Sequence, residues 1–185
     1  MAAPPRIGIL TVSDRAAAGI YEDRGGPAVR AVLDAALDGP WVAIARIVAD
    51  ELEDIRGALV TLVDTDGCAL VLTTGGTGPA LRDVTPEATR AVCDRELPGF
   101  GEAMRAASRA SVPTAILSRQ TAGVRGAALI VNLPGSPRGA AECLEAVLAA
   151  AVHGVAVVGG PQLPLGGVGG DPHPEAVNMK IPRAR

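Results

Sequence analysis

The segment TTGGTGP (residues 73–79) contains the residue types best suited to binding an anion. Its glycines permit positive φ angles and let backbone amides approach an anion closely, and its threonine hydroxyls supply further donors. The segment is not a P-loop, because no Gly-Lys-Ser/Thr follows it, and the G-x-G-x-x-G spacing of a dinucleotide site is absent. Spacing alone leaves phosphate binding and a tight strand-to-loop turn equally open.

Two carboxylates could hold a divalent metal beside such an anion. Asp83 stands in RDVTP shortly after the glycines, and Asp50 directly follows another apolar run. Magnesium prefers one or two carboxylates together with substrate phosphate oxygens. Each residue also has a structural alternative, Asp83 as a cap or Asx turn and Asp50 as a helix N-cap. Without a P-loop lysine, phosphate charge would have to be neutralised by metal, amides and arginines, of which Arg82, Arg119 and Arg125 are available.

Two further polar segments could contact a ligand. NLPGSP (residues 132–137) offers an amide side chain, a tight turn and a hydroxyl ahead of a predicted helix, whose N-terminus favours anions. Ser13-Asp14 is either a turn or a ligand-contacting pair, and Ser136 is either a cap or a ligand contact. The two histidines have no companion nucleophile, so a Ser-His-Asp or Cys-His mechanism is not expected. Paired-carboxylate hydrolysis stays open but leaves the glycine segment unexplained.

The elements that must position these residues alternate along the chain. Apolar runs predict strands over residues 6–12, 41–48, 68–73 and 127–133. Helical periodicity and start signals predict helices over residues 26–37, after Asp50, from Thr85 onward, over 101–110 and over 138–152. Residues 115–120 are ambiguous and could form a short edge segment.

This alternation favours an α/β fold with a mostly parallel sheet and helices on both faces. In such sheets, ligands bind where loops leave the carboxyl ends of the strands. Ser13-Asp14, Asp50, residues 74–83 and residues 132–136 all follow predicted strands. We therefore expect them to gather along one edge of the sheet.

Length and composition bound the remaining possibilities. A chain of 185 residues predicts one domain, and with 48% hydrophobic but 2% aromatic residues the core must consist of aliphatic side chains. A net charge of −3 gives no electrostatic case for binding nucleic acid. Cys68, Cys93 and Cys143 lie far apart without a CxxC pair, so they are expected to be reduced core residues.

No targeting signal is expected from the N-terminal residues. The N-terminus lacks a leader pattern and no apolar run is expected to reach membrane-spanning length, so a cytoplasmic globular protein without a membrane contact is expected. From Gly159 onward glycine and proline dominate. We predict a main domain over residues 1–158 and a tail over 159–185 that wraps the surface or a neighbouring subunit.

Taken together, the motifs resemble the molybdopterin adenylyltransferase family over residues 6–152. They are TVSDRAAAGIYEDRGG, LTTGGTGPALRDVTPEAT, ELPGFGEAMR, PTAILSRQTAG and LIVNLPGSPRGAAECLEAV. The resemblance implies a three-layer α/β molybdopterin-binding fold that assembles as a homotrimer. It also implies that ATP and molybdopterin give adenylylated molybdopterin and pyrophosphate with Mg²⁺, and that the product passes to a molybdenum insertase.

The resemblance also assigns roles to residues. Asp50 in VADELEDI and Asp83 in RDVTP fall on the family's two important acidic positions, and we expect both to bind the Mg²⁺ that bridges ATP. The residues expected to bind ATP or molybdopterin are Ser13, Asp14, Thr74, Gly75, Gly76, Thr77, Gly78, Arg82, Asn132, Pro134, Gly135 and Ser136.

Two departures from the family pattern bear on function. Some relatives carry a second basic residue where Leu81 stands, so phosphate neutralisation there is weaker or comes from another arginine, and the chain after His153 matches poorly. Two alternatives stay open: a protein of the same fold that binds molybdopterin without transferring an adenylyl group, and a non-catalytic trimeric scaffold that presents the pterin to a partner. A fragment of a fused enzyme is less favoured, because one domain accounts for nearly the whole sequence.

Overall fold

The computed structural model describes residues 3–166 and contains one six-stranded sheet with the strand order β2-β1-β3-β6-β5-β4. The first four strands in this order run parallel, and β5 and β4 are antiparallel to their neighbours. Every residue of β3 is buried, which explains why its sequence is an uninterrupted apolar run. The strands are β1 (Arg6–Val12), β2 (Val42–Val48), β3 (Cys68–Thr74), β4 (Arg95–Glu96), β5 (Ala122–Arg125) and β6 (Ala128–Leu133).

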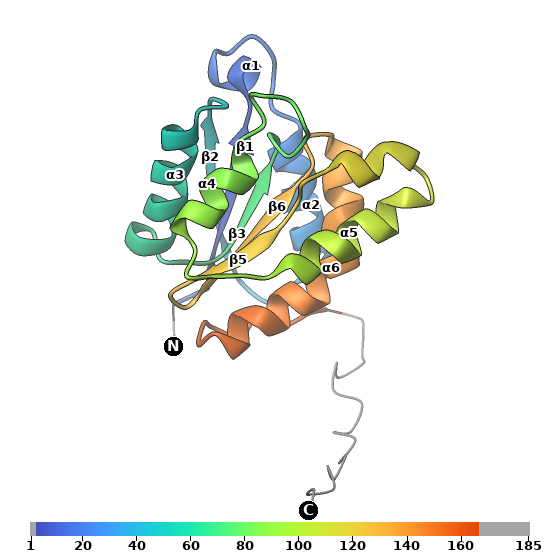
Figure 1. The fold of residues 1–185 in the computed structure, drawn as a ribbon. Coiled ribbons are helices and arrows are strands. Elements are labelled where there is room, and N and C mark those ends of the chain that lie inside the picture. Colours follow the sequence, from blue (N-terminus) through green and yellow to red (C-terminus); the bar gives the residue numbers. More distant parts are fainter. Residues whose placement is uncertain (1–2, 167–185) are drawn as a thin grey trace, which may run out of the picture.

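Helices cover both faces of the sheet, so the predicted three-layer, mostly parallel α/β fold is confirmed (Figure 1). One face carries α2 (Gly25–Ala36), α5 (Pro98–Arg109) and α6 (Pro137–Val157). The other face carries α3 (Leu52–Val60) and α4 (Thr85–Val92). Three short helical segments complete the described chain, namely α1 (Asp14–Ala17), the π-helical η1 (Thr61–Thr65) and the 3₁₀-helical η2 (Pro113–Leu117).

The core has two halves, one on each side of the sheet. Along β1, Ile7 and Ile9 pack into the half under α2 and α6, whereas Leu10 and Val12 pack into the half under α3 and α4. This follows from the two-residue period of a strand, which sends successive side chains to opposite faces. The side chains in both halves are almost all aliphatic, as the scarcity of aromatics predicts.

Three sequence expectations about the elements are corrected. One edge of the sheet is formed by the short strand β4, which pairs with β5, whereas residues 115–120, left ambiguous with an edge segment as one possibility, overlap η2. Helix α5 begins at Pro98, because proline suits the first helical turn, so the expected start at residue 101 is late. Helix α6 extends past the expected end at residue 152 to Val157.

Helix α6 also corrects the expectation about membrane-spanning length. The helix has 21 residues, and an 18-residue stretch of it has a mean hydropathy of 1.6, so it is long and apolar enough to cross a membrane by length and composition alone. Seven of its residues, including Leu144, Val147 and Ala151, are nevertheless buried in the core beneath the sheet. Its apolar character is therefore explained by packing inside the protein.

The chain after α6 returns along the end of α2. Leu163 is buried, the amide of Asp38 donates to the Pro164 carbonyl (2.8 Å), and the amide of Gly166 donates to the Ala36 carbonyl (2.7 Å). The first part of the expected tail thus lies against the surface of its own domain. Residues 167–185 lie outside the described residues, so the boundary at residue 158 and the role of the tail stay predictions.

Candidate active site

The candidate site lies where the strand order changes direction. From β1 the chain continues to β2 on one side, and from β3 it continues to the strands β4, β5 and β6 on the other side. The carboxyl ends of two such strands leave a crevice between them, which is the usual ligand position in open α/β sheets. A cavity of about 190 Å³ opens there, lined among others by Ser13, Asp50, Gly75, Gly76 and Gly135. The expectation that the polar segments gather at one edge is confirmed.

The glycine segment is tightly packed at its start. Gly75 and Gly76 have φ angles of +108° and +61°, which disfavour any other residue. A Cβ at Gly75 would lie 2.1 Å from the carbonyl oxygen of Val12. The Thr74 hydroxyl is turned away from solvent and donates to the carbonyl of Pro134 (2.9 Å). The tight-turn alternative for this part of the segment is therefore correct.

Gly76, Thr77 and Gly78 have backbone amides that are free to bind an anion. Within residues 3–166, the amides of Gly76, Thr77 and Gly78 donate to no protein acceptor. Consecutive free amides beside positive-φ glycines form a concave surface that accepts anions. A tight turn and an anion site are thus compatible here, because different residues of the segment serve each purpose.

Asp50 is held by Asp14 rather than by the helix that follows it. The amide of Asp14 donates to Asp50 Oδ2 (2.8 Å), and the amide of Asp50 donates to Asp14 Oδ1 (3.0 Å). The N-cap of α3 is Glu51, which makes no side-chain cap hydrogen bond, so the expected N-cap role of Asp50 is wrong. Burial raises the pKa of Asp50, and the nearby charges of Asp14 and Asp83 act in the same direction.

Asp83 lies in a closed loop opposite Asp50. Its Oδ2 accepts from the amide of Ala80 (2.9 Å), while its own amide donates to the Ala80 carbonyl (3.0 Å). The turn alternative is therefore right in part, although the N-cap of α4 is Val84. A Cβ at Gly78 would lie 2.8 Å from Asp83 Oδ2, so the carboxylate lies directly over the glycine segment. One of its oxygens, Oδ1, makes no hydrogen bond within the described chain.

Arg82 connects the Asp83 loop to the Asp14–Asp50 pair. Its guanidinium donates to both carboxylate oxygens of Asp14 (2.8 and 2.7 Å) and to Glu51 (2.8 Å). The hydrogen bond from the Asp50 amide and the neighbouring Arg82 lower the pKa of Asp14. Arg82 and Asp14, both expected to bind substrate, thus bind each other next to Asp50.

The other two arginines considered for phosphate binding have protein partners. Arg125 donates to Asp64 and to the carbonyl of Val92 (2.8 Å), and it lies beside Ala128, where β6 begins. It is therefore at the opposite end of the sheet and cannot neutralise phosphate at the candidate site. Arg119 lies near the glycine segment, but its guanidinium donates to two backbone carbonyls and to Glu87.

The segment after β6 contributes mainly backbone to the site. Asn132 is fully buried and donates to the hydroxyls of Thr73 (3.1 Å) and Thr89 (2.8 Å), which places its side chain away from the cavity. Its expected direct contact with substrate is therefore not supported. Ser136 accepts from the amide of Gly139 (3.2 Å) as the N-cap of α6, so the cap alternative is correct.

The beginning of α1 resembles that of α6 in its capping. Ser13 is the N-cap and accepts from the amide of Ala16 (3.3 Å). Gly135 lies so close to the glycine segment that a Cβ there would be 3.3 Å from the Cα of Gly75. Gly135 and Ser13 thus form walls of the cavity, with Pro134 fixed behind them by its bond from Thr74.

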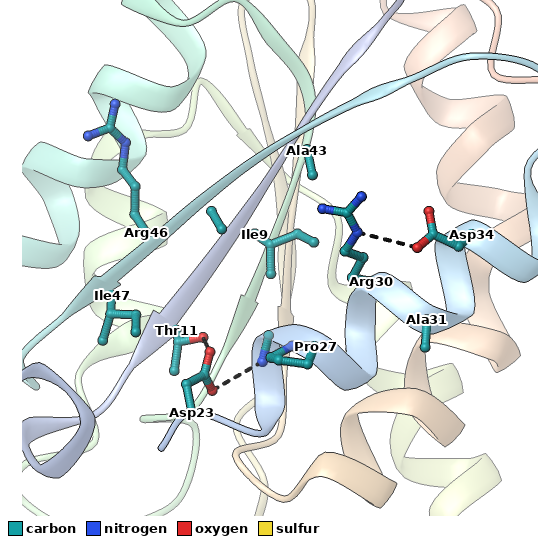
Figure 2. A pocket seen from close by; sticks show the side chains of 12 residues that line it. Ile9, Thr11, Asp23, Pro27, Arg30, Ala31, Asp34, Ala43, Arg46 and Ile47 are labelled. Atoms are coloured by element: carbon teal, nitrogen blue, oxygen red, sulfur yellow. Dashed lines mark hydrogen bonds and ion pairs between the residues drawn. The ribbon is translucent and has the colours of Figure 1, made fainter. Parts of the chain in front are cut away.

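Sequence analysis missed Asp23, which lies between this cavity and a second one. Its Oδ1 accepts from the amides of Gly25 (2.9 Å) and Gly26 (3.2 Å) at the start of α2, and its Oδ2 accepts from the Thr11 hydroxyl (2.8 Å) (Figure 2). The second cavity, of about 450 Å³, lies between α2 and β2 and shares Thr11 and Asp23 with the first. An acid two residues before a Gly-Gly-Pro helix start is a signal that could have revealed Asp23.

The donor set fits magnesium only together with substrate. No group of three or more His, Cys, Asp or Glu side chains in residues 3–166 could by itself hold a metal ion. The charges of Asp14 and Asp83 both disfavour the ionised form of Asp50, so these carboxylates lie within electrostatic range of one another. A divalent cation would relieve this repulsion, and phosphate oxygens would supply the missing ligands.

Comparisons with known proteins agree with this geometry. A family model described as a probable molybdopterin binding domain matches residues 8–154. The molybdopterin adenylyltransferase of Helicobacter pylori is 57% identical over 144 residues, which are 78% of this chain and 82% of the relative. That of Escherichia coli K12 is 54% identical over 154 residues, 81% and 79% of the two chains.

Solved structures give the same result. The molybdopterin biosynthesis enzyme MoaB of Thermus thermophilus superposes with a TM-score of 0.77 at 48% identity, covering 85% of this chain and 98% of that one. The molybdopterin biosynthesis Mog protein of Mycobacterium ulcerans superposes with a TM-score of 0.76 at 37% identity, covering 83% and 99%. The chain therefore belongs to the molybdopterin adenylyltransferase family.

Proposed function

We propose that the chain transfers AMP from ATP to the phosphate of molybdopterin, within the biosynthesis of the molybdenum cofactor. An oxygen of the molybdopterin phosphate attacks the α-phosphorus of ATP. The bond from the α-phosphorus to the bridging oxygen of the β-phosphate breaks, and pyrophosphate leaves. The observation that carries the proposal is the set of three free amides, Gly76 to Gly78, directly under the carboxylates of Asp50 and Asp83.

The residues of the site act by positioning and by charge. The free amides receive phosphate oxygens, and the capped N-terminus of α6 presents further positive backbone potential beside Gly135. Such phosphoryl-group chemistry requires no nucleophile from the protein, because both reacting groups come from the substrates. This explains why a site without a candidate catalytic serine, cysteine or histidine is chemically sufficient.

Asp50 and Asp83 would hold Mg²⁺. When bound, this ion neutralises the charge that develops on the pyrophosphate leaving group. The reciprocal hydrogen bonds with Asp14 fix the main chain at Asp50, and the bonds with Ala80 fix Asp83. Asp50 leaves its Oδ1 free of hydrogen bonds within the described chain, as Asp83 does, so each carboxylate retains a ligand atom.

The cellular location, the assembly and the partners are proposed from the family resemblance. The enzyme works in the cytoplasm as a homotrimer, and it passes its product to a molybdenum insertase by transient contact. Its partners are otherwise the small molecules ATP and molybdopterin.

Pyrophosphate release under anaerobic conditions tests the reaction. Purified protein is incubated with Mg-ATP, with and without molybdopterin, and Asp83→Asn and Asp64→Asn serve as a matched pair. Both carboxylates are partly exposed, but Asp64 pairs with Arg125 at the far end of the sheet. We expect release that requires molybdopterin, is lost in Asp83→Asn, and is unchanged in Asp64→Asn.

Other results would replace the proposal. Molybdopterin binding without pyrophosphate release would indicate a binding scaffold. Normal turnover of Asp83→Asn would remove Asp83 from the metal site. Release without molybdopterin would indicate an ATP pyrophosphohydrolase.

A further inference from the structure

Arg119 contacts both ends of the loop that carries Asp83. Its Nε donates to the carbonyl of Gly78 (2.8 Å), and an Nη donates to the carbonyl of Asp83. Its own amide donates to the carbonyl of Thr77 (2.8 Å). One residue, 36 to 42 positions away in sequence from these partners, therefore fixes the backbone where the loop begins and where it ends.

These contacts determine which atoms the loop can offer to an anion. The carbonyl oxygens of Thr77, Gly78 and Asp83 are all engaged by Arg119. The amides of Gly76, Thr77 and Gly78 are left without an acceptor in residues 3–166. Because carbonyl oxygens repel an anion and amides attract it, this division suits the loop for phosphate.

Arg119 is itself held by α5. The guanidinium of Arg105 donates to the carbonyls of Ser118 (3.2 Å) and Gln120 (2.9 Å), which flank Arg119. Gly101 packs so closely on this segment that a Cβ there would lie 2.1 Å from the Gln120 carbonyl oxygen. The motif ELPGFGEAMR thereby supports the backbone from which Arg119 extends.

The charge of Arg119 is already paired. Its remaining Nη donates to the carboxylate of Glu87 on α4, so every guanidinium nitrogen has a protein acceptor. Its side chain is 35% exposed, and it does not line the cavity at the candidate site. Direct phosphate binding would require breaking these contacts.

We propose that Arg119 is a positioning residue, which holds the Gly78–Asp83 loop so that the Asp83 carboxylate and the free amides face the substrate. The proposal rests on the proposed function for the identity of that substrate. That Arg119 fixes the shape of the loop in the substrate-free protein does not depend on the proposed function. Arg105 and Gly101 extend the same support back to α5.

Arg119→Ala and Arg119→Lys test the proposal, with Arg125→Ala as a matched control. Arg125 also combines backbone and carboxylate acceptors, with one carbonyl where Arg119 has two, and it is 26% exposed, but it lies at the opposite end of the sheet. The readouts are kcat and KM for ATP, the melting temperature, and hydrogen exchange of the substrate-free protein. The exchange probes are the amides of Ala80 and Asp83, which close the loop.

We expect Arg119→Ala to lower kcat about 100-fold, the scale of a small misplacement of reacting groups. We expect the loop amides to exchange at least about 10-fold faster, because the carbonyls at both ends lose their donor. Arg119→Lys should keep part of the protection of the loop amides from exchange. The ammonium group of lysine can donate to one carbonyl, but it cannot donate to both ends of the loop as the guanidinium does. Arg125→Ala should change neither kcat nor loop exchange.

Unchanged loop exchange combined with a large rise in KM for ATP would overturn the proposal in favour of direct phosphate binding. If Arg119→Ala does not fold, loop exchange and the KM for ATP of Arg119→Lys test the proposal in its place. If the wild-type protein releases no pyrophosphate, the proposed function fails, while loop exchange still decides whether Arg119 holds the loop.

Discussion

Asp14 and Asp50 are joined by a reciprocal pair of hydrogen bonds, in which the amide of each residue donates to the carboxylate of the other at 2.8 and 3.0 Å. The pair ties the end of β1 to the end of β2. It leaves one carboxylate oxygen of Asp50 free for a metal ion. Both carboxylate oxygens of Asp14, in contrast, already accept hydrogen bonds, because Asp14 also accepts from Arg82. The two acidic residues therefore have different roles.

Asp14→Ala is expected to lower kcat about 10-fold or more, because the Asp50 backbone loses its acceptor and Arg82 loses its partner. Asp14→Asn keeps a carbonyl oxygen that can accept from the Asp50 amide, so it should retain more activity. Steady-state kinetics of both variants measures this. Asp34→Ala, which removes an exposed carboxylate that pairs only with Arg30 among residues 3–166, is the control. Equal activity of all variants would refute the role of Asp14.

Gly75→Ala is expected to destabilise the fold strongly. Its φ of +108° and a Cβ 2.1 Å from the Val12 carbonyl oxygen combine backbone strain with a steric clash. Gly67 also has a positive φ (+68°), but nothing lies within 4 Å of a Cβ there, so Gly67→Ala should cost about 1–2 kcal/mol from strain alone. Urea denaturation should place Gly75→Ala at least about 2 kcal/mol below Gly67→Ala. Equal free energies of unfolding for the two variants would show that the backbone around Gly75 moves to accommodate the Cβ at no cost.

Leu81→Arg is expected to improve ATP binding. Leu81 is 101% exposed in the loop between Gly78 and Asp83. An exposed charge near a polyanion should lower KM for ATP about 2- to 5-fold, and the gain should shrink as salt screens it. Kinetics at low and high ionic strength measures this. Val157→Arg, at the far end of α6, is the exposed control and should have no effect.

Cys93 is expected to react slowly with alkylating reagents. Burial raises the pKa of its thiol to about 11 from 9.0, with Asp94 acting in the same direction. The thiolate is the reactive form, so iodoacetamide at pH 8 should modify Cys93 about 100-fold more slowly than a model thiol of pKa 9. Because the folded pKa is raised, the rate should keep rising with pH beyond 9 and level off only near 11. Mass spectrometry of the native protein measures this, and levelling off near pH 9 would contradict it.

The parallel part of the sheet and the place of the site could be predicted from the sequence. Apolar runs such as residues 68–73 and helix starts such as Thr85-Pro86 are local patterns, and their alternation permits few topologies. Once the strands are parallel, the segments that follow them must meet at one edge. Asp50, Asp83 and the glycine segment were therefore placed together without tertiary information.

Only the tertiary structure decided which partner each polar side chain takes. Asp50 had an N-cap of α3 as its structural alternative but pairs with Asp14, and Arg119 was one of three arginines available for phosphate but holds the backbone of the Asp83 loop. These partners are tens of residues apart, so no local spacing specifies them. A hydrogen bond depends on atoms meeting within about 3 Å, which requires the packed backbone.

The short elements at the sheet edge have the same explanation. Strands β4 and β5 have two and four residues, too few for a two-residue period to be recognised, and they form because they pair with β6 and with each other. The sequence by itself determined the long elements, whose patterns repeat over several turns or pleats. The fold decided the pairs, caps and edges, because these depend on contacts that exist only after the chain has packed.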